Sequence, residues 1–173
     1  PALHRRQALA VASRIGDRVR APYYPMPLPV IATTVLEKKT LIAQKSLLNV
    51  IDLAEQADVT FVGVGTLDED AAMLRDGFVK PDEIRSLMRA GAAGEIVGWA
   101  YDAEGRLIEG LTNDRVLSVP LQSPAKRKVI GVCMALPRLK ALRGALTGRL
   151  INGLITNERM AEALLKNRDS AYG

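Results

Sequence analysis

An apolar strand that runs directly into a glycine-containing loop is the feature of this sequence that most constrains its fold. The segment Ala57–Leu67 reads ADVTFVGVGTL, in which the strand Val59–Val62 is followed by Gly63, Gly65 and Thr66. Ligands of open α/β sheets bind at the carboxyl ends of strands, where glycines let the backbone approach and N–H groups face an anion. A tight turn after a buried strand uses glycines for conformational reasons alone. The segment therefore predicts an α/β sheet and leaves open whether its loop is a ligand site or only a turn.

The remaining segments alternate between helical and strand patterns. Helices are expected at 3–19, 34–57, 68–74, 81–90, 137–148 and 158–166, and strands at 59–62, 94–101, 116–119, 128–134 and 154–155. Three prolines in 21–29 exclude a helix interior there and indicate an extended connection with a possible edge strand. This order predicts the α/β class, as a doubly wound, mostly parallel sheet with helices on both faces. The turn DAEG at Asp102–Gly105 predicts a small antiparallel insertion.

The pattern opens with a helix, whereas a doubly wound domain usually opens with a strand that carries a first phosphate loop. We therefore expect residues 1–173 to form one domain that is incomplete at its N-terminus. A chain of 173 residues suits one domain, and its 48% hydrophobic residues can build a core. No apolar run approaches the roughly 20 residues of a membrane span.

Charge is distributed unevenly along the chain. Residues 1–120 hold 14 Lys and Arg against 16 Asp and Glu, while residues 121–173 hold 10 against 3. A basic end of this kind fits DNA, an anionic metabolite or an acidic protein surface, and also an ordinary solvated face. The sequence shows neither a helix-turn-helix pattern nor zinc-finger spacing, and its 4% aromatic content disfavours a base-stacking platform.

The few residues with reactive side chains favour a binding function over catalysis. Cys133, the single cysteine, cannot form an internal disulfide, which fits a reducing cytoplasm. The single histidine, His4, lies near the terminus on an arginine-rich helix, and no residues have metal-ligand or nucleophile-elbow spacing. We therefore expect no catalytic residue, no metal and no cofactor.

Three side chains could contact a ligand. Asp102 ends a strand behind Trp99 and Tyr101, so its carboxylate could accept hydrogen bonds from sugar hydroxyls, but turns also favour aspartate. Lys140 lies one turn into the helix after strand 128–134 and could reach a phosphate or carboxylate, although most lysines are simply exposed. Arg115 could contact an anion or flank a strand in solvent.

Five segments in this order resemble one family. They are ADVTFVGVGTL, GAAGEIVGWAYDAEG, NDRVLSVPL, a strand and helix bearing Lys140, and LINGLITNERMAEALL. Together they resemble the C-terminal sugar-binding domain of SorC-type bacterial transcriptional regulators, over nearly the whole chain. The resemblance implies a fold similar to phosphosugar isomerases and a domain that binds a phosphorylated sugar or related carbohydrate without converting it.

The resemblance also implies partners and site residues. Such a regulator is cytoplasmic, forms a dimer or tetramer, and binds operator DNA through an N-terminal helix-turn-helix domain that this sequence does not contain. Gly63, Gly65 and Thr66 would form the ligand loop, Asp102 would contact hydroxyls, and Lys140 would be the basic residue after the penultimate strand. The family usually has a glycine pair before that lysine, where this chain has Leu136 and Pro137.

Two other functions remain open from the sequence. One is a sugar-phosphate isomerase or deaminase, which needs a positioned acid and base. The other is an oligomerisation module in which the substitution by Leu136 and Pro137 has removed the ligand.

Overall fold

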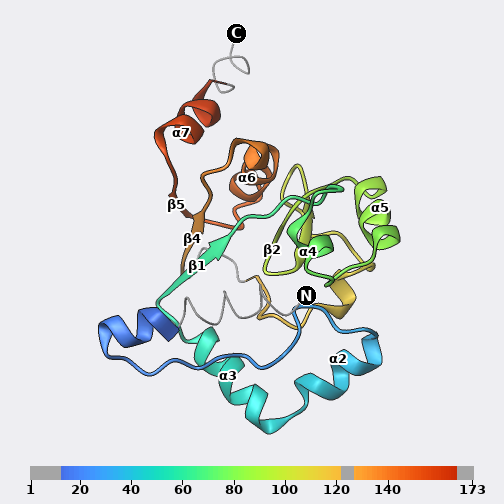
Figure 1. The fold of residues 1–173 in the computed structure, drawn as a ribbon, viewed down its shortest axis with the longest axis vertical. Helices are drawn as coiled ribbons and strands as arrows, with labels where there is room; N and C mark the ends of the chain where they lie inside the picture. Colours follow the sequence, from blue (N-terminus) through green and yellow to red (C-terminus); the bar gives the residue numbers. More distant parts are fainter. Residues whose placement is uncertain (1–12, 122–126, 167–173) are drawn as a thin grey trace.

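The computed structural model describes residues 13–121 and 127–166 (Figure 1). Residues 13–19 are helical, as expected, and the expected positions 3–12, with His4, lie outside the described residues. The proline-rich segment 21–29 has no regular structure, so the possible edge strand is not formed there.

The expected helix 34–57 is two helices, α2 (Val35–Ile42) and α3 (Lys45–Glu55). Thr34 caps α2 by accepting the Glu37 N–H at 3.0 Å. The helix breaks because Gln44 is extended, with φ −73° and ψ 126°, and its carbonyl then accepts the N–H of Leu48 at the start of the new helix. Figure 1 shows α2 and α3 as an arm beside the main body.

A parallel sheet of three strands forms the centre of the fold, in the order β1–β4–β5. Its strands are β1 (Val59–Gly63), β4 (Lys128–Val132) and β5 (Gly153–Ile155). Val62 lies beside Gly131, and Val132 lies beside Ile155. The expected mixed α/β architecture with a mostly parallel sheet is confirmed.

The connections also agree with most expectations. They contain α4 (Ala72–Arg75), α5 (Pro81–Arg89), the 3-10 turns η1 (Asn113–Arg115) and η2 (Leu136–Arg138), α6 (Leu139–Thr147) and α7 (Glu158–Leu165). Asn157 caps α7 by accepting the Met160 N–H at 3.0 Å, as predicted. Asp68 does not begin a helix: its Oδ1 accepts the Asp70 N–H in a turn, and α4 starts at Ala72.

The expected strand 94–101 is an antiparallel hairpin of β2 (Ala92–Ile96) and β3 (Trp99–Asp102), so the single-strand prediction is wrong. Val97 and Gly98 turn the chain with φ 48° and 93°. Two positive φ angles suit a tight hairpin turn, but a β-branched residue rarely adopts one, so the sequence did not signal it.

The predicted turn after β3 is present, but the prediction of a strand at 116–119 is wrong. Residues after the DAEG turn return along β3, where Leu107 bridges Tyr101. Val116 makes only an isolated bridge to Ile31. Asn113 of η1 takes the place of a pairing strand, because its side chain bonds both the N–H and the carbonyl of Ala100, at 2.8 and 2.9 Å.

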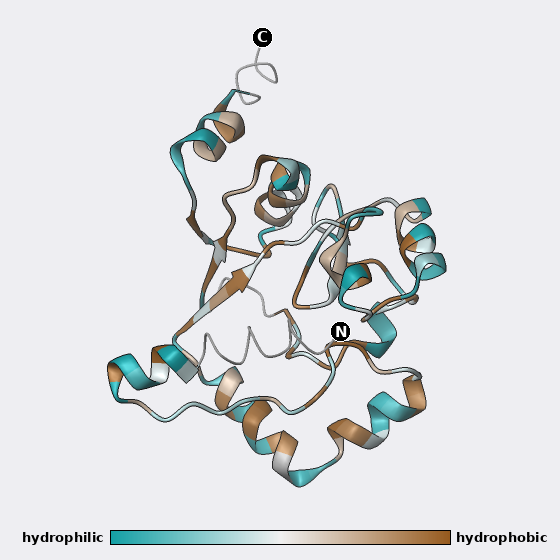
Figure 2. Ribbon diagram, in the orientation of Figure 1, coloured by the Kyte–Doolittle hydropathy of each residue, from teal (hydrophilic) through white to brown (hydrophobic). Residues whose placement is uncertain are grey.

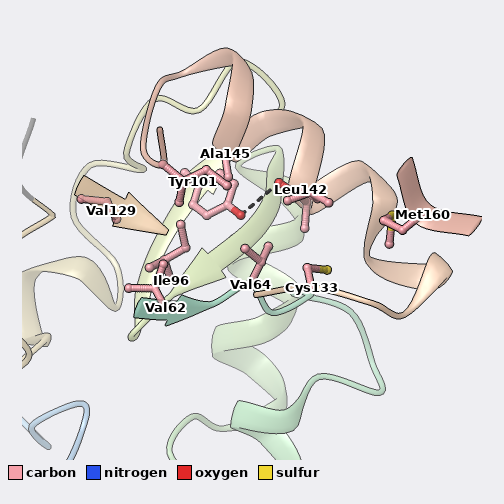
Figure 3. Close-up of a cluster of buried hydrophobic side chains, with 11 residues drawn as sticks. Val62, Val64, Ile96, Tyr101, Val129, Cys133, Leu142, Ala145 and Met160 are labelled. Atoms are coloured by element: carbon pink, nitrogen blue, oxygen red, sulfur yellow. Dashed lines mark hydrogen bonds between the residues drawn. The ribbon is translucent and has the colours of Figure 1, made fainter. Parts of the chain in front are cut away.

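The hairpin and α6 pack against one face of the parallel sheet. Val62 and Val129 of the sheet, Ile96 and Tyr101 of the hairpin, and Leu142 of α6 share one buried cluster (Figure 3). The Tyr101 hydroxyl donates to the Ala141 carbonyl at 3.0 Å, which joins hairpin and helix. A second cluster lies among α4, α5 and β3.

The other face of the sheet is only partly covered among the described residues. On this face, Phe61 is 63% exposed, Ile155 is 45% exposed and Val59 is 37% exposed. Figure 2 shows hydrophobic residues along these strands. The expected helices on both faces are therefore seen on one face only within 13–121 and 127–166.

Candidate functional site

The carboxyl ends of the three parallel strands bring three loops to one edge of the sheet. The loop after β1 begins at Val64, the loop after β4 at Cys133, and the loop after β5 at Thr156. Ligands of open α/β sheets bind at this edge. Gly65 and Thr66 lie in the first loop and Gly63 is the last residue of β1, so the structure places these three predicted residues at or next to this edge.

Gly65 joins the edge of the sheet to the hairpin. Its N–H donates to the Glu95 carbonyl at 2.9 Å, and its carbonyl accepts the Glu95 N–H at 3.0 Å. A Cβ built on Gly65 would overlap the Glu95 carboxylate and lie 2.9 Å from its Cδ. A larger residue at 65 would therefore displace the Glu95 side chain from its position against the loop.

Glu95 places a partly buried carboxylate beside the ligand loop. Its Oε2 accepts the Gly98 N–H at 2.8 Å. Burial raises the pKa of Glu95, while the Gly98 hydrogen bond and the positive charge of Arg138 act in the opposite direction. This carboxyl group can hold a proton more readily than an exposed one, and as a carboxylate it accepts hydrogen bonds from hydroxyl groups.

Arg138 brings a guanidinium group to the same edge from the turn η2 that follows β4. Its Nη1 donates to the Val64 carbonyl at 3.2 Å, so it bridges the loops after β4 and β1. Arg138 also lowers the pKa of the buried thiol of Cys133, although burial raises that pKa overall. A guanidinium in this position can pair with a phosphate or carboxylate.

The third loop is fixed to the second by side-chain hydrogen bonds. Thr156 Oγ1 donates to the Cys133 carbonyl at 2.5 Å, and Asn157 Nδ2 donates to the Met134 carbonyl at 3.2 Å. Asn157 also caps α7, so it stabilises both the loop and the start of the helix. These contacts hold the edge in one shape.

Lys140 lies exposed on the first turn of α6, close in sequence to Arg138. Leu136 and Pro137, which replace the family's glycine pair, form the 3-10 turn η2 that leads into this helix. Proline has no N–H to offer a ligand there. Arg138 thus brings positive charge to this edge, and Lys140 follows two residues later in the chain.

Asp102 makes its carboxylate hydrogen bonds within its own turn. Its backbone carbonyl and that of Ala103 face Gly144, in the second half of α6. Its Oδ1 accepts the N–H groups of Glu104 and Arg106 at 3.0 and 2.9 Å, and its Oδ2 accepts Arg106 Nε at 2.8 Å. The carboxylate thus holds the DAEG turn together, which is the alternative that the sequence had left open.

These contacts explain the charge state of Asp102. Burial raises its pKa, but the backbone and side-chain hydrogen bonds from Arg106 outweigh that effect, and the net pKa lies below the ordinary value of 3.8. Arg115 is also internal to the fold, since its Nη1 donates to the Ala32 carbonyl at 2.7 Å and its Nη2 pairs with Glu83.

Glu95 and Arg138 are the residues that sequence reasoning missed. Glu95 stands inside the apolar run GEIVGWAY, where it reads as one polar position of a strand. Only the hairpin brings it to Gly65. The signal for Arg138 was its place two residues before Lys140, in the segment between a strand and the next helix.

Two hollows lie elsewhere on the surface. One of about 890 Å³ includes Thr33, Lys80 and Arg115 in its lining, and one of about 520 Å³ lies along β1 and includes Thr60 and Phe61. Neither is lined by Gly63, Gly65, Thr66, Asp102 or Lys140. No helix within the described ranges is long and apolar enough to cross a membrane.

Comparison with known proteins identifies the family. A family model described as "Putative sugar-binding domain" matches residues 1–166. The erythritol catabolism regulatory protein EryD of Brucella abortus is 29% identical over 155 residues, which are 90% of this chain and 49% of that protein. The transcriptional regulator LsrR of Klebsiella pneumoniae is 37% identical over 145 residues, which are 82% of this chain and 44% of that protein.

A solved structure agrees with these relatives. The full-length sorbitol operon regulator SorC from Klebsiella pneumoniae superposes with a TM-score of 0.78 at 26% identity, over 87% of this chain and 49% of that one. The chain spans about half the length of the curated relatives it matches. It belongs to the sugar-binding domain family of SorC-type transcriptional regulators.

Proposed function

We propose that this domain senses a phosphorylated sugar, or a related carbohydrate, at the carboxyl edge of its parallel sheet. The observation that carries the proposal is the meeting of Gly65, Glu95 and Arg138 at the place where α/β sheets bind ligands. A carboxylate and a guanidinium side by side suit a ligand with hydroxyls and an anionic group.

The predicted residues fit this proposal unequally. Gly63, Thr66 and Lys140 belong to the proposed site, with Lys140 attracting the phosphate as a mobile point charge. Gly65 acts by giving room to Glu95. The hydroxyl-binding role first predicted for Asp102 is now proposed for Glu95, because the Asp102 carboxylate already holds the DAEG turn.

The domain would control transcription through population shift. A ligand that binds one conformation more tightly favours that conformation, and so changes the operator affinity of a helix-turn-helix domain in the same polypeptide. The regulator would work in the cytoplasm as a dimer or tetramer. The named relatives are regulators, and this supports a binding domain over an isomerase or deaminase.

A thermal-shift and calorimetric screen with free and phosphorylated sugars tests the proposal. A ligand at 100 times its Kd should stabilise the protein by about 2.7 kcal/mol. Lys140→Ala should weaken the binding of phosphorylated ligands more than that of their unphosphorylated forms. Lys39→Ala, at an exposed lysine on the separate helix α2, should leave binding unchanged. Absence of any ligand response, or equal effects of both substitutions, contradicts the proposal. Turnover of ribose 5-phosphate or glucosamine 6-phosphate would favour the enzyme instead.

A further inference from the structure

Two charged side chains contact consecutive residues of the first ligand loop. Arg138 Nη1 donates to the Val64 carbonyl at 3.2 Å, and the Glu95 carboxyl group lies against Gly65. Neither side chain takes part in a salt bridge with a residue of 13–121 or 127–166. A guanidinium group has several N–H donors, and only Nη1 of Arg138 donates to a described residue, so further donors remain for an anion.

The Glu95 carboxyl group also has one oxygen to spare. Its Oε2 accepts the Gly98 N–H at 2.8 Å. Its Oε1, the oxygen that a Cβ on Gly65 would meet first, accepts no hydrogen bond from the described part of the chain. A carboxyl oxygen that accepts when ionised becomes a donor when it takes up a proton. Glu95 can therefore meet a ligand in two charge states.

Glu95 is the ionisable group of this cluster that changes charge at moderate pH. Burial raises its pKa above the ordinary 4.5, although the Gly98 hydrogen bond and the charge of Arg138 lower it. Burial also raises the pKa of Tyr101 on β3 above 10.0 and that of Cys133 above 9.0, so both stay neutral below about pH 8. The two helices packed against β2 add other charged side chains, which are Asp82, Glu83, Arg85 and Arg89 of α5 and Lys140 and Arg143 of α6. None of these contributes to the raised pKa of Glu95.

We propose that an anionic group of the ligand binds Arg138 and that Glu95 takes up a proton from solvent as it binds. The inference rests on the proposed function and adds how that same site responds to pH. An anion on Arg138 offsets the positive charge that favours the Glu95 carboxylate, and it places a second negative charge beside a partly buried acid. The neutral carboxyl group then donates a hydrogen bond where a carboxylate would repel the anion. Anionic ligands therefore bind more tightly as the pH falls.

Sulfate binding to the complete gene product tests the proposal, because sulfate keeps its own charge at all the pH values used. At constant ionic strength, the Kd of sulfate should rise at least about threefold between about pH 5 and about pH 8, since proton uptake and anion binding favour each other. Calorimetry in two buffers of different ionisation enthalpy should show proton uptake on binding. A Kd that does not change with pH overturns the proposal, and so does absence of sulfate binding.

Two substitutions assign the effect to its residues. Glu95→Gln keeps the size of the side chain without its charge, so the Kd of sulfate should change less than about 1.5-fold over the same range. Glu109→Gln, at an exposed position after the DAEG turn, should keep the dependence of the wild type. Arg138→Met should abolish sulfate binding, whereas Arg89→Gln, at an exposed arginine of α5, should not.

The outcomes separate this inference from the proposed function. An undiminished pH dependence in Glu95→Gln, or unchanged sulfate binding in Arg138→Met, overturns the proton coupling at this pair. A response to phosphorylated sugars together with a pH-independent Kd for sulfate leaves the proposed function standing and refutes the coupling alone. Absence of any response to sugars contradicts the proposed function itself.

Discussion

The side chain of Asn113 offers the sharpest test of how the hairpin is held. It is 6% exposed and makes three hydrogen bonds: Oδ1 accepts the Ala100 N–H at 2.8 Å, and Nδ2 donates to the carbonyls of Ala100 and Ile108 at 2.9 and 2.6 Å. Asn113→Ala removes all three. The Ala100 carbonyl keeps the Ile108 N–H at 3.0 Å, so the buried Ala100 N–H is the group left without a partner.

The magnitude follows from these contacts. An orphaned buried N–H costs about 1–3 kcal/mol, and loss of the hydrogen bond to the partly exposed Ile108 carbonyl costs about 0.5–1.5 kcal/mol. We therefore expect Asn113→Ala to lower the free energy of unfolding by about 1.5–4.5 kcal/mol. Asp114→Asn, at the exposed neighbouring position, should change it by less than about 0.5 kcal/mol.

Urea unfolding followed by the fluorescence of Trp99, the single tryptophan, measures both variants. The m-value should stay constant, so that the shift in midpoint reports stability alone. Asn113→Asp adds a second criterion. Its carboxylate keeps the acceptor for Ala100 but faces two carbonyls, so this variant should lose further stability as the pH rises through the pKa of the new carboxyl group. If Asn113→Ala unfolds within about 0.5 kcal/mol of Asp114→Asn, the reasoning about a buried bridging amide is refuted.

Three further substitutions test other contacts. Burial raises the pKa of Glu95 above its ordinary 4.5, so its ionisation opposes folding and stability should fall as the pH rises from about 4.5 towards the pKa of the folded state. Glu95→Gln should remove this fall in urea titrations, and an unchanged pH dependence would exclude Glu95 as its source. The pKa of Asp102 is lowered from 3.8, so its charge stabilises the fold above that pH and the benefit disappears as the pH falls through the folded pKa. Asp102→Asn should reduce this loss of stability at acid pH. An acid unfolding curve like that of the wild type would contradict a stabilising role of the Asp102 charge in the turn. Gly105→Ala should destabilise the protein by about 2–5 kcal/mol, because φ is +77° and the new Cβ would lie 2.5 Å from the Gly148 Cα. Gly63→Ala, whose Cβ meets open space, should change the urea midpoint little, and similar costs at both positions would contradict the steric argument.

Local sequence signals were sufficient for the elements with clear boundaries. The strands β1 and β4 are short apolar runs, α5 begins at Pro81, and α7 begins directly after its N-cap Asn157. These signals act within a few residues of the chain, so they can be read without the fold. The hairpin was missed because Val97 adopts a positive φ that its side chain disfavours, and surrounding contacts maintain it.

The candidate site was predictable only in part. Gly65 was singled out, but the reason for a glycine there is the side chain of Glu95, thirty positions later, which crosses it in the folded hairpin. Sequence spacing cannot show such a contact between distant segments. Asp102 carried two interpretations, and only the hydrogen bonds from Arg106 distinguish them.

The two backbone hydrogen bonds between Gly65 and Glu95 have a mechanical consequence. They fasten the first ligand loop to β2, and the Tyr101 hydroxyl fastens β3 to α6 through the Ala141 carbonyl. Loop, hairpin and helix thus form one linked body, with Lys140 at the start of that helix. We expect a ligand that displaces the Glu95 backbone to move the hairpin and α6 together with the first ligand loop, because these hydrogen bonds join the three elements.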